Sequence, residues 1–342
     1  MKEAMFYRSG KGGLVGCTLC PRKCSGIADG QSGFCGVRKN VGGKLYSLVY
    51  GKAVSVAIDP VEKKPLFHFA PGSSCLSIAT PGCNLRCLNC QNFEISQEFG
   101  KIDCADLPPE DVVQTALSHG LPGIAYTYTE PTVFYEYALD IMRLAKREGL
   151  YNVWVSNGYT APAAIRRMAR FLDAVNVDIK GDDGFYRKVC MAQGVSPVHA
   201  SLRAYKKAGV WIEVTTLVIP GLNDGEKCIR DISKWIKGNL GTGTPLHFSA
   251  FFPNYKLAGI KPTPAGTLAR CHEIAKKAGL RYVYVGNVPG DDRESTRCWK
   301  CGTVMIKRDG YRISSFMAKC PKCGASVKMS GMRWSPMIPQ KR

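Results

Sequence analysis

Long apolar stretches are missing from this chain of 342 residues. No run of about 18 apolar residues occurs, so the sequence predicts no membrane-spanning helix. The first residues, Met1 to Gly16, lack an apolar core and therefore do not resemble a signal peptide. We expect a globular cytoplasmic protein, in a compartment where disulfide bonds are rare.

Acidic residues are scarce, with 27 Asp and Glu against 47 Lys and Arg, which gives a formal net charge of +20. The imbalance is greatest from Thr296 onward, where eleven basic residues accompany a single acid, Asp309. A basic tail suits a polyanion such as nucleic acid, or an acidic protein. A solvated surface that keeps a protein soluble has the same composition, so charge alone identifies no partner.

Cysteine, in contrast, is abundant, with 16 residues that include groups of four, three and four. In a reducing compartment, thiols at gaps of two or three residues indicate metal ligands rather than disulfides. Five cysteines lie outside the groups, and we expect them to be small buried hydrophobic residues. They are Cys75, Cys104, Cys190, Cys228 and Cys271.

The middle group has the spacing C-x3-C-x2-C, formed by Cys83, Cys87 and Cys90, and no fourth cysteine follows closely. Iron–sulfur clusters are normally held by four cysteine thiolates. Three thiolates therefore leave one iron of a cubane cluster without a protein ligand and open to a substrate or cofactor. A structural zinc site completed by a distant Cys or His is the alternative.

The first group lies in a Gly-rich, basic segment that is too small for a core of its own. We call its members the N-terminal tetrad: Cys17, Cys20, Cys24 and Cys35. Zinc in a four-thiolate cage and an auxiliary 4Fe–4S cluster both fit this number of ligands. The sequence therefore predicts a metal site and leaves the metal open.

The last group consists of two C-x2-C-Gly pairs separated by 18 residues. We call its members the C-terminal tetrad: Cys298, Cys301, Cys320 and Cys323. Between the pairs, the stretches 304–307 and 311–314 flank Asp309-Gly310, which predicts a β-hairpin with a D-G turn. This pattern is typical of a zinc-ribbon-like or rubredoxin-like module. Zinc is favoured, and a single redox-active iron is the alternative.

The central region alternates apolar strand candidates with helical patterns. Strands are expected at 75–79, 123–128, 152–156, 174–179, 211–218 and 246–252, with an edge strand at 282–286. Helices are expected at 133–148, 163–171, 196–208 and 264–278. Six βα units in series predict an α/β fold with a parallel sheet, and they suit a partial (β/α)6 barrel.

The remaining sequence divides the chain into four predicted parts. Apolar patterns at 45–50 and 53–58 indicate a β-hairpin that turns at Gly51-Lys52. We therefore expect an N-terminal four-cysteine and β-hairpin module at 1–73 and the partial barrel at 74–290. A zinc-ribbon-like module is expected at 291–330, and a flexible basic tail at 331–342.

Three of the predicted strands close with polar residues, as Thr129-Glu130, Ser156-Asn157 and Asp178-Ile179-Lys180. Active sites of such barrels lie where the strands end, so these residues should converge on the middle cysteine group. Together with that group they resemble the activating-enzyme branch of the radical S-adenosylmethionine (SAM) superfamily, whose best-known member activates pyruvate formate-lyase. The stretches 17–24, 45–69 and 282–290 are similar to the AmmeMemoRadiSam-system radical SAM enzyme.

The resemblance implies a 4Fe–4S cluster on Cys83, Cys87 and Cys90, with the amine and carboxylate of SAM on the fourth iron. Cleavage of SAM would then yield methionine and a 5′-deoxyadenosyl radical that abstracts hydrogen from a substrate. It also implies an electron donor of the flavodoxin or ferredoxin type, and partners of the Memo and AMMECR families.

Three functions remain open at this stage. The substrate can be a protein or peptide backbone, as for the activating enzymes. It can also be an RNA nucleotide, if the basic C-terminal module docks RNA. The third hypothesis, from a different class, is a nucleic-acid-binding metalloprotein whose barrel is not catalytic.

The resemblance also assigns roles to single residues. Glu130 and Thr129 would hold the SAM ammonium, Ser156 and Asn157 would reach its ribose or carboxylate, and Asp178 with Lys180 matches the D-x-K motif of glycyl-radical activating enzymes. The structural alternatives are a helix N-terminal charge, a turn cap and an ion pair.

Four positions depart from the pattern of the family. Tyr128 and Thr129 stand where glycines are usual, and Val155 stands where the activating enzymes often carry Asp. Asn89 replaces the aromatic residue that is usual near the adenine.

Overall fold

The structure is a computed structural model that describes residues 1–338. Its centre is an eight-stranded sheet of order β15-β14-β13-β12-β11-β10-β8-β7. Seven strands are parallel and follow one another along the sheet in chain order. They are β8 (Ser74–Ala79), β10 (Gly123–Tyr126), β11 (Tyr151–Ser156), β12 (Ala174–Asp178), β13 (Trp211–Val218), β14 (Leu246–Ala250) and β15 (Val283–Gly286). The predicted α/β fold with a parallel sheet is confirmed.

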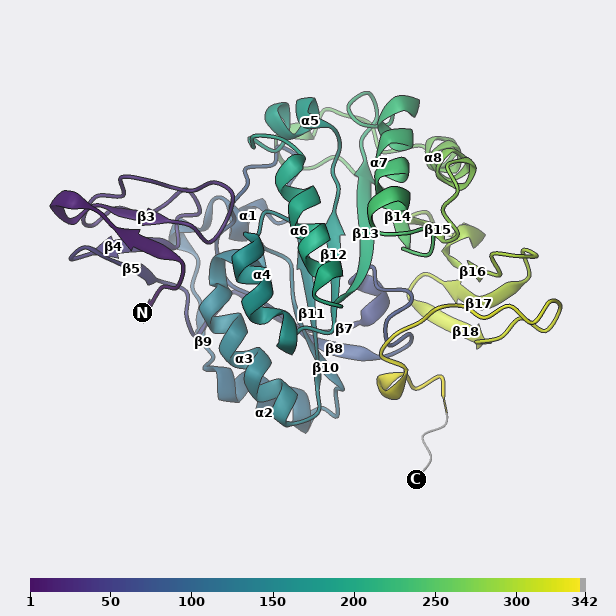
Figure 1. Cartoon of the computed structure of the whole chain (residues 1–342), viewed down its shortest axis with the longest axis horizontal. Coiled ribbons are helices and arrows are strands. Elements are labelled where there is room, and N and C mark those ends of the chain that lie inside the picture. Colours follow the sequence, from purple (N-terminus) through teal and green to yellow (C-terminus); the bar gives the residue numbers. More distant parts are fainter. Residues whose placement is uncertain (339–342) are drawn as a thin grey trace.

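Helices alternate with these strands and cover the outer face of the sheet (Figure 1). They are α1 (Phe93–Ser96), α2 (Pro109–Ser118), α3 (Tyr135–Arg147), α4 (Pro162–Met168), α5 (Asp183–Lys188), α6 (Ser196–Lys207), α7 (Glu226–Asn239) and α8 (Ala265–Lys277). Each of the longer helices buries one apolar stripe; α3, for example, buries Ala138, Ile141, Met142 and Ala145. The inner face is partly covered by residues 61–69, where Asn176 of β12 donates to the Pro65 carbonyl at 2.8 Å.

The hairpin predicted for residues 45–58 is wrong. β5 (Lys44–Ser47) pairs with β1 (Lys2–Glu3) and β4 (Arg38–Val41) in a small N-terminal sheet. β7 (Ser55–Pro60) instead pairs antiparallel with β8 and forms the edge of the central sheet. Alternating apolar residues do not identify the partner strand, and in β7 the alternating Val56 and Ile58 are 45% and 50% exposed. β7 therefore belongs to the central sheet, although the predicted boundary placed it before residue 74.

Short strand pairs complete the two ends of the molecule. At the N-terminal end, β2 (Tyr7–Ser9) pairs with β3 (Val15–Cys17), and β6 (Lys52–Ala53) pairs with β9 (Ala105–Asp106). At the C-terminal end, β16 (Thr296–Arg297), β17 (Val304–Asp309) and β18 (Arg312–Phe316) form an antiparallel sheet. The predicted β17–β18 hairpin is confirmed, and Gly310 at its tip has a φ of 57°.

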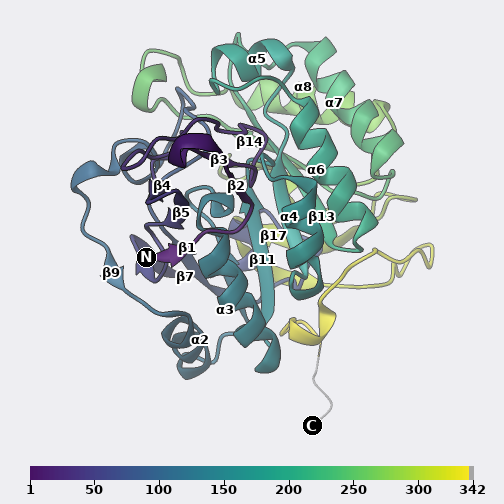
Figure 2. The same cartoon turned by 60° about the vertical axis from the view of Figure 1, so that its left-hand side comes forward.

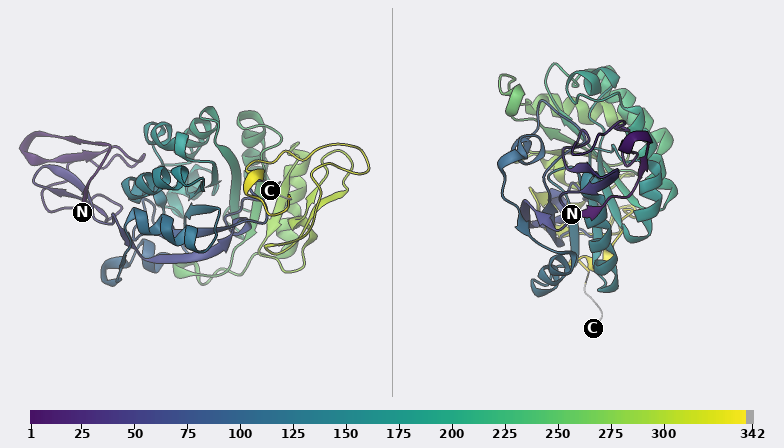
Figure 3. Two further views of the ribbon diagram at one scale, coloured as in Figure 1. Left: turned by 90° about the horizontal axis from the view of Figure 1, so that it is seen from below. Right: turned by 90° about the vertical axis from the view of Figure 1, so that its left-hand side faces the viewer.

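These two ends lie on opposite sides of the central sheet. Figure 3 shows the N-terminal strands at one end of the molecule and the C-terminal strands at the other. In Figure 2, where the N-terminal end comes forward, β2–β5 lie in front of the central sheet. In residues 1–338, no helix has the length and apolar character needed to cross a membrane.

The tail predicted to be flexible from residue 331 is docked as far as Ser335. The ring of Trp334 lies 5.4 Å from that of Tyr151 and 6.0 Å from that of Phe69, and its Nε1 donates to the Gly149 carbonyl at 2.9 Å. Ser335 is buried and donates to the Pro71 carbonyl at 2.6 Å. Because the residues around Trp334 are polar or small, no pattern in the sequence indicated that this segment is docked. Residues 339–342 of the predicted tail lie outside the described residues.

His68 joins the C-terminal end to the central sheet. Its ring is fully buried, with Nδ1 2.8 Å from the Lys328 carbonyl and Nε2 2.5 Å from the Tyr284 hydroxyl. Because a carbonyl only accepts, Nδ1 carries the hydrogen and Nε2 accepts from Tyr284. Burial lowers the pKa of His68 to about 4, and the nearby Glu213 offsets part of this effect. The neutral ring is therefore part of the folded structure.

The fold should lose stability in acid because of His68. The unfolded residue takes up a proton near its usual pKa, whereas the folded residue does so only near pH 4. The contribution is complete above pH 6.5, and we expect it to fall by about 3 kcal/mol as the pH drops to 4. Denaturant unfolding of wild type and His68→Asn at pH 7, 5.5 and 4.5 measures this loss. A variant with the same pH slope as wild type would contradict the assignment.

Candidate active site

The middle cysteines lie on residues 80–92, here called the cluster loop, which follows the carboxyl end of β8. Cys83, Cys87 and Cys90 are all partly exposed and form no disulfide. The backbone N–H of Leu85 lies 3.4 Å from the Cys83 sulfur, and the Ser96 hydroxyl lies 3.2 Å from the Cys90 sulfur. Hydrogen bonds of this kind stabilise thiolates and tune metal clusters bound to them.

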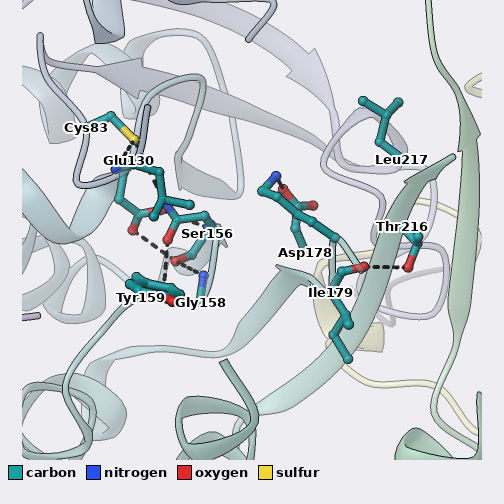
Figure 4. A network of polar contacts seen from close by, with 12 residues as sticks. Cys83, Glu130, Ser156, Gly158, Tyr159, Asp178, Ile179, Thr216 and Leu217 are labelled. Carbon is teal, nitrogen blue, oxygen red and sulfur yellow. Dashed lines mark hydrogen bonds and ion pairs between the residues drawn. The ribbon is translucent and has the colours of Figure 1, made fainter. Parts of the chain in front are cut away.

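Glu130 is the centre of a polar network beside this loop (Figure 4). Its carboxylate accepts from the backbone and hydroxyl of Thr132 at 3.0 and 2.6 Å, from the Ser156 hydroxyl at 2.9 Å and from the Asn157 backbone at 2.8 Å. The network joins the end of β10 to the end of β11, as parallel strands with adjacent carboxyl ends allow. The predicted neighbours Glu130, Ser156 and Asn157 therefore meet.

Asn157 connects that network to the cluster loop. Its side-chain amide lies 3.7 Å from the Cys83 sulfur and donates to the Asn84 side chain at 2.8 Å. Asn84, which sequence reasoning did not single out, in turn donates to the Tyr159 carbonyl at 2.8 Å. The sequence did contain one signal for this role, because Asn84 is a polar residue directly after Cys83, within the cysteine motif.

The carboxylate of Glu130 is 2% exposed and already accepts four hydrogen bonds. A carboxylate offers about four lone-pair sites, so a SAM ammonium that contacts Glu130 has to replace or share one of these donors. Burial raises the pKa of Glu130 and the four donors partly offset this. Burial and the nearby Glu130 charge likewise raise the pKa of Cys83.

Thr129 and Tyr128 occupy the turn before Glu130. The Thr129 hydroxyl donates to the Thr80 carbonyl at 2.7 Å, so it holds the start of the cluster loop. Tyr128 has a φ of 64°, a region where glycine is unstrained and a bulky residue is uncommon. Its carbonyl accepts from Asn92 at 2.8 Å, and its hydroxyl donates to Asp59. These contacts hold the strained backbone at Tyr128, a position where the resemblance implies glycine.

Asp178 and Lys180 form an ion pair of 2.6 Å at the end of β12, and their side chains are 33% and 19% exposed. Burial disfavours the charged form of Lys180, but Asp178 and the thiols of Cys87 and Cys190 raise its pKa well above the usual value. Lys180 therefore faces the cluster loop as a cation. Figure 4 shows Asp178 set apart from the group around Glu130.

Cys190, expected to be a buried bystander, is buried but lies against the cluster loop. Its carbonyl accepts from the Arg86 backbone at 3.2 Å, and interaction of its thiol with that of Cys87 raises the pKa of Cys190 and lowers that of Cys87. Nothing in the local sequence around Cys190 marks this contact, which depends on how residues 189–191 pack.

A cavity of about 520 Å³ opens on the inner face of the sheet, on the side of β13–β15. Thr215, directly opposite Asp178 in the strand register, lines it together with His247 and Tyr284. Residues 309–311 at the tip of the C-terminal hairpin form another wall. Its size is within the range of small-molecule and side-chain pockets. The cluster loop does not line this cavity.

The C-terminal tetrad has the geometry of a single-metal site. All four sulfurs lie within 4.8 Å of one another, with Cys298–Cys323 at 3.5 Å and Cys301–Cys320 at 3.4 Å. A tetrahedral zinc ion with zinc–sulfur bonds of about 2.3 Å requires sulfurs spaced in this way. Among residues 1–338, no other set of three or more Cys, His, Asp or Glu ligand atoms is this compact.

Comparison with known proteins identifies the family. The model of the radical SAM superfamily matches residues 77–232, which include the cluster loop, Glu130, Asn157 and Asp178. A curated protein of Methanocaldococcus jannaschii, "Uncharacterized protein MJ0808", is 46% identical over 96% of this chain and 99% of its own length. The pyruvate formate-lyase-activating enzyme of Clostridium pasteurianum is 26% identical over 46% of this chain and 66% of its own length.

Among the solved structures similar to this chain is a domain of pyruvate-formate lyase-activating enzyme from Bacteroides vulgatus. It is 15% identical with a TM-score of 0.43, and the match covers 48% of this chain and 99% of that chain. The family model carries the assignment. Residues 77–232 belong to the radical SAM superfamily, whose members are enzymes of radical redox chemistry.

Proposed function

We propose that Cys83, Cys87 and Cys90 hold a 4Fe–4S cluster with one open iron, and that the enzyme cleaves SAM reductively. When bound, this cluster supplies the electron that splits SAM into methionine and a 5′-deoxyadenosyl radical. The observation that carries the proposal is that three unpaired, partly exposed thiols lie on one loop after β8, with the Asn157 amide beside Cys83. Three soft thiolate ligands are the donor set that iron–sulfur clusters use.

A buried polar atom supports the binding of SAM at this loop. Asn89 is 9% exposed, and its side-chain Oδ1 has no hydrogen-bond partner among the described residues. An unpaired buried acceptor is costly, so a ligand that donates to it gains affinity. The amino group of adenine is such a donor. We infer that Asn89 takes over by hydrogen bonding the place of the aromatic residue that is usual there.

The remaining contacts follow from charge. The Lys180 cation and the Asp178 carboxylate form a partly exposed ion pair at the end of β12, suited to a zwitterionic ligand such as the methionyl end of SAM. Ser156 and Asn157 lie at the end of β11, where Glu130 fixes them. Thr129 acts by holding the cluster loop.

Spectroscopy of the reconstituted protein tests this proposal. The anaerobic, reduced protein should show an S = 1/2 electron paramagnetic resonance (EPR) signal that shifts when SAM is added, because SAM ligates the open iron. Cys87→Ala should lose this SAM-dependent shift, whereas the matched control Cys104→Ala should keep it. An identical SAM effect in Cys87→Ala and wild type would refute the assignment.

The cavity on the inner face supports a protein or peptide substrate over RNA. Glu62, Glu294 and Asp309 line it with one cation, Lys63, and burial raises the pKa of Glu62 to about 7, so that this carboxyl carries only part of a charge at neutral pH. The remaining excess of negative charge disfavours the phosphates of a nucleic acid. A peptide carries no phosphate charge and can place apolar side chains against Phe67, Phe252 and Tyr311.

An electron donor of the flavodoxin or ferredoxin type and proteins of the Memo and AMMECR families are proposed partners.

Binding measurements at different salt concentrations distinguish the two substrates. If the protein acts on a peptide, affinity for single-stranded or duplex RNA should be weak and should not depend on the cavity. Charge reversal by Glu294→Lys should then leave RNA binding unchanged. Tight RNA binding whose logarithm falls with log salt by about 0.7 to 0.9 per phosphate contact would favour the RNA alternative.

We further propose that the C-terminal tetrad binds one zinc ion and that the ion keeps the hairpin wall of the cavity in place. The four-thiolate geometry fits zinc, and such modules depend on the metal for folding. Cys320→Ala should therefore lose one zinc per chain and expose residues 296–330 to fast amide hydrogen exchange. Zinc content by atomic emission and exchange mass spectrometry check this result. Unchanged protection in a zinc-free variant would contradict it.

A further inference from the structure

The N-terminal tetrad surrounds a small pocket. All four of its cysteines line this pocket, together with Leu19, Gly33, Val133 and Thr132. Four thiols around one space, with Arg38 beside them, suit a compact inorganic group held by sulfur. Arg22 and Asn84 complete its wall on the side of the cluster loop.

Spacing separates this site from a zinc site. The four sulfurs of the C-terminal tetrad lie within 4.8 Å of one another, whereas in the described chain no three ligand atoms of the N-terminal tetrad meet that limit. A single tetrahedral ion requires a compact set because all four sulfurs bind one atom. A cubane cluster spreads its four thiolates farther apart, because each binds a different iron.

A backbone amide points at one sulfur of this tetrad. The Phe34 N–H donates to the Cys24 sulfur at 3.4 Å. Amide donors to sulfur are among the features that set the potential of an iron–sulfur cluster.

The pocket adjoins the cluster loop directly. Arg22 Nε donates to the Asn84 carbonyl at 2.8 Å, and Asn84 follows Cys83 in the chain. Gly82, which precedes Cys83, has a φ of 98°, and a Cβ at that position would lie 3.0 Å from the Cys35 carbonyl and 2.8 Å from Val37. The two cysteine segments therefore approach so closely that only glycine fits between them.

We infer that Cys17, Cys20, Cys24 and Cys35 hold a second 4Fe–4S cluster, fully ligated by protein, in the segment that packs against the cluster loop. This inference rests on the proposed function for the identity of the neighbouring cluster, but not for its own metal. A zinc ion in this place would be redox-inert, whereas a cluster puts a one-electron carrier next to Cys83.

Removal of the first cluster isolates the second. The triple variant Cys83→Ala/Cys87→Ala/Cys90→Ala, reconstituted anaerobically, should retain about four irons and one zinc per chain and a reducible cluster signal by EPR. Adding Cys20→Ser and Cys24→Ser to this variant should remove the iron and leave the zinc. Two zincs per chain and no iron in the triple variant would overturn the inference, whatever the wild-type protein does with SAM.

The close contact between the two cysteine segments gives a second readout that does not depend on turnover. In fully reduced wild type the two paramagnetic clusters should couple, so that the EPR signal of the N-terminal cluster is broadened or split relative to the triple variant. Partial reduction, which leaves most molecules with only one reduced cluster, should restore the narrow signal. Two independent, unbroadened signals in fully reduced wild type would contradict the placement of the cluster beside the cluster loop.

Discussion

Replacement of Arg38 by methionine is expected to lower the free energy of unfolding by about 3–5 kcal/mol, the usual effect of breaking a buried ion pair on one side. Arg38 lies on β4 and forms a two-pronged pair with Glu136 of α3, with both distances 2.8 Å and both side chains 2% exposed. Glu136 also accepts from the Met5 backbone at 2.6 Å, and Arg38 donates to the Met5 carbonyl. The pair fastens the N-terminal sheet to the central domain.

The size of this effect follows from what remains after substitution. Without Arg38, the Glu136 carboxylate stays buried without a countercharge, and this desolvation cost exceeds the value of the pair itself. Denaturant unfolding followed by circular dichroism measures the change. Lys227→Met, which removes an exposed pair with Asp231, is the matched control and should leave the stability close to that of wild type.

The double variant Arg38→Met/Glu136→Leu sharpens this test. It replaces both charges by apolar groups, so it should recover much of the stability that the single variant loses. An Arg38→Met protein within about 1 kcal/mol of wild type would show that the N-terminal sheet is not anchored by this pair. Equal losses in the single and double variants would instead show that packing, rather than charge, dominates.

Replacement of Glu130 by alanine should reduce the rate of SAM cleavage by at least about tenfold, an effect of about 1.4 kcal/mol on the barrier. Four hydrogen-bond donors lose their acceptor in this variant, including the Asn157 backbone that positions the Asn157 amide beside Cys83. Iron content should be retained because no ligand is removed. The yield of 5′-deoxyadenosine per minute at saturating SAM measures the effect.

Glu130→Gln distinguishes direct contact with SAM from positioning. If the carboxylate binds the SAM ammonium, removing its charge weakens SAM binding, and the Kd measured by EPR titration rises. If Glu130 acts only through Asn157, the rate falls while the Kd stays near that of wild type. A Glu130→Ala protein with wild-type rate and Kd would contradict both roles.

The parallel sheet was predictable because its strands are apolar on both faces and alternate with helices. The position of β7 was not, since Val56 and Ile58 alternate as well in an isolated hairpin as in an edge strand. Trp334 was missed for another reason. A single aromatic residue in a polar tail carries no periodic signal, and its site between Phe69 and Tyr151 is formed by distant segments.

The candidate site likewise has a part that could be predicted from the sequence and a part that could not. Glu130, Ser156 and Asn157 follow strand ends, so the topology alone places them near the cluster loop. Cys190 lies after α5 rather than at a strand end, and only the packing of residues 189–191 against the loop brings it to Cys87. The difference in spacing between the two tetrads is also invisible in sequence, because it depends on where loops place sulfur atoms.

The most direct test of the account is the conversion of SAM by the reduced, anaerobically reconstituted protein. Wild type should release methionine and 5′-deoxyadenosine in equal amounts, as quantified by liquid chromatography and mass spectrometry. Cys87→Ala should form neither above the level without enzyme, and Cys104→Ala should match wild type. Equal yields of 5′-deoxyadenosine from wild type and Cys87→Ala would contradict the central claim.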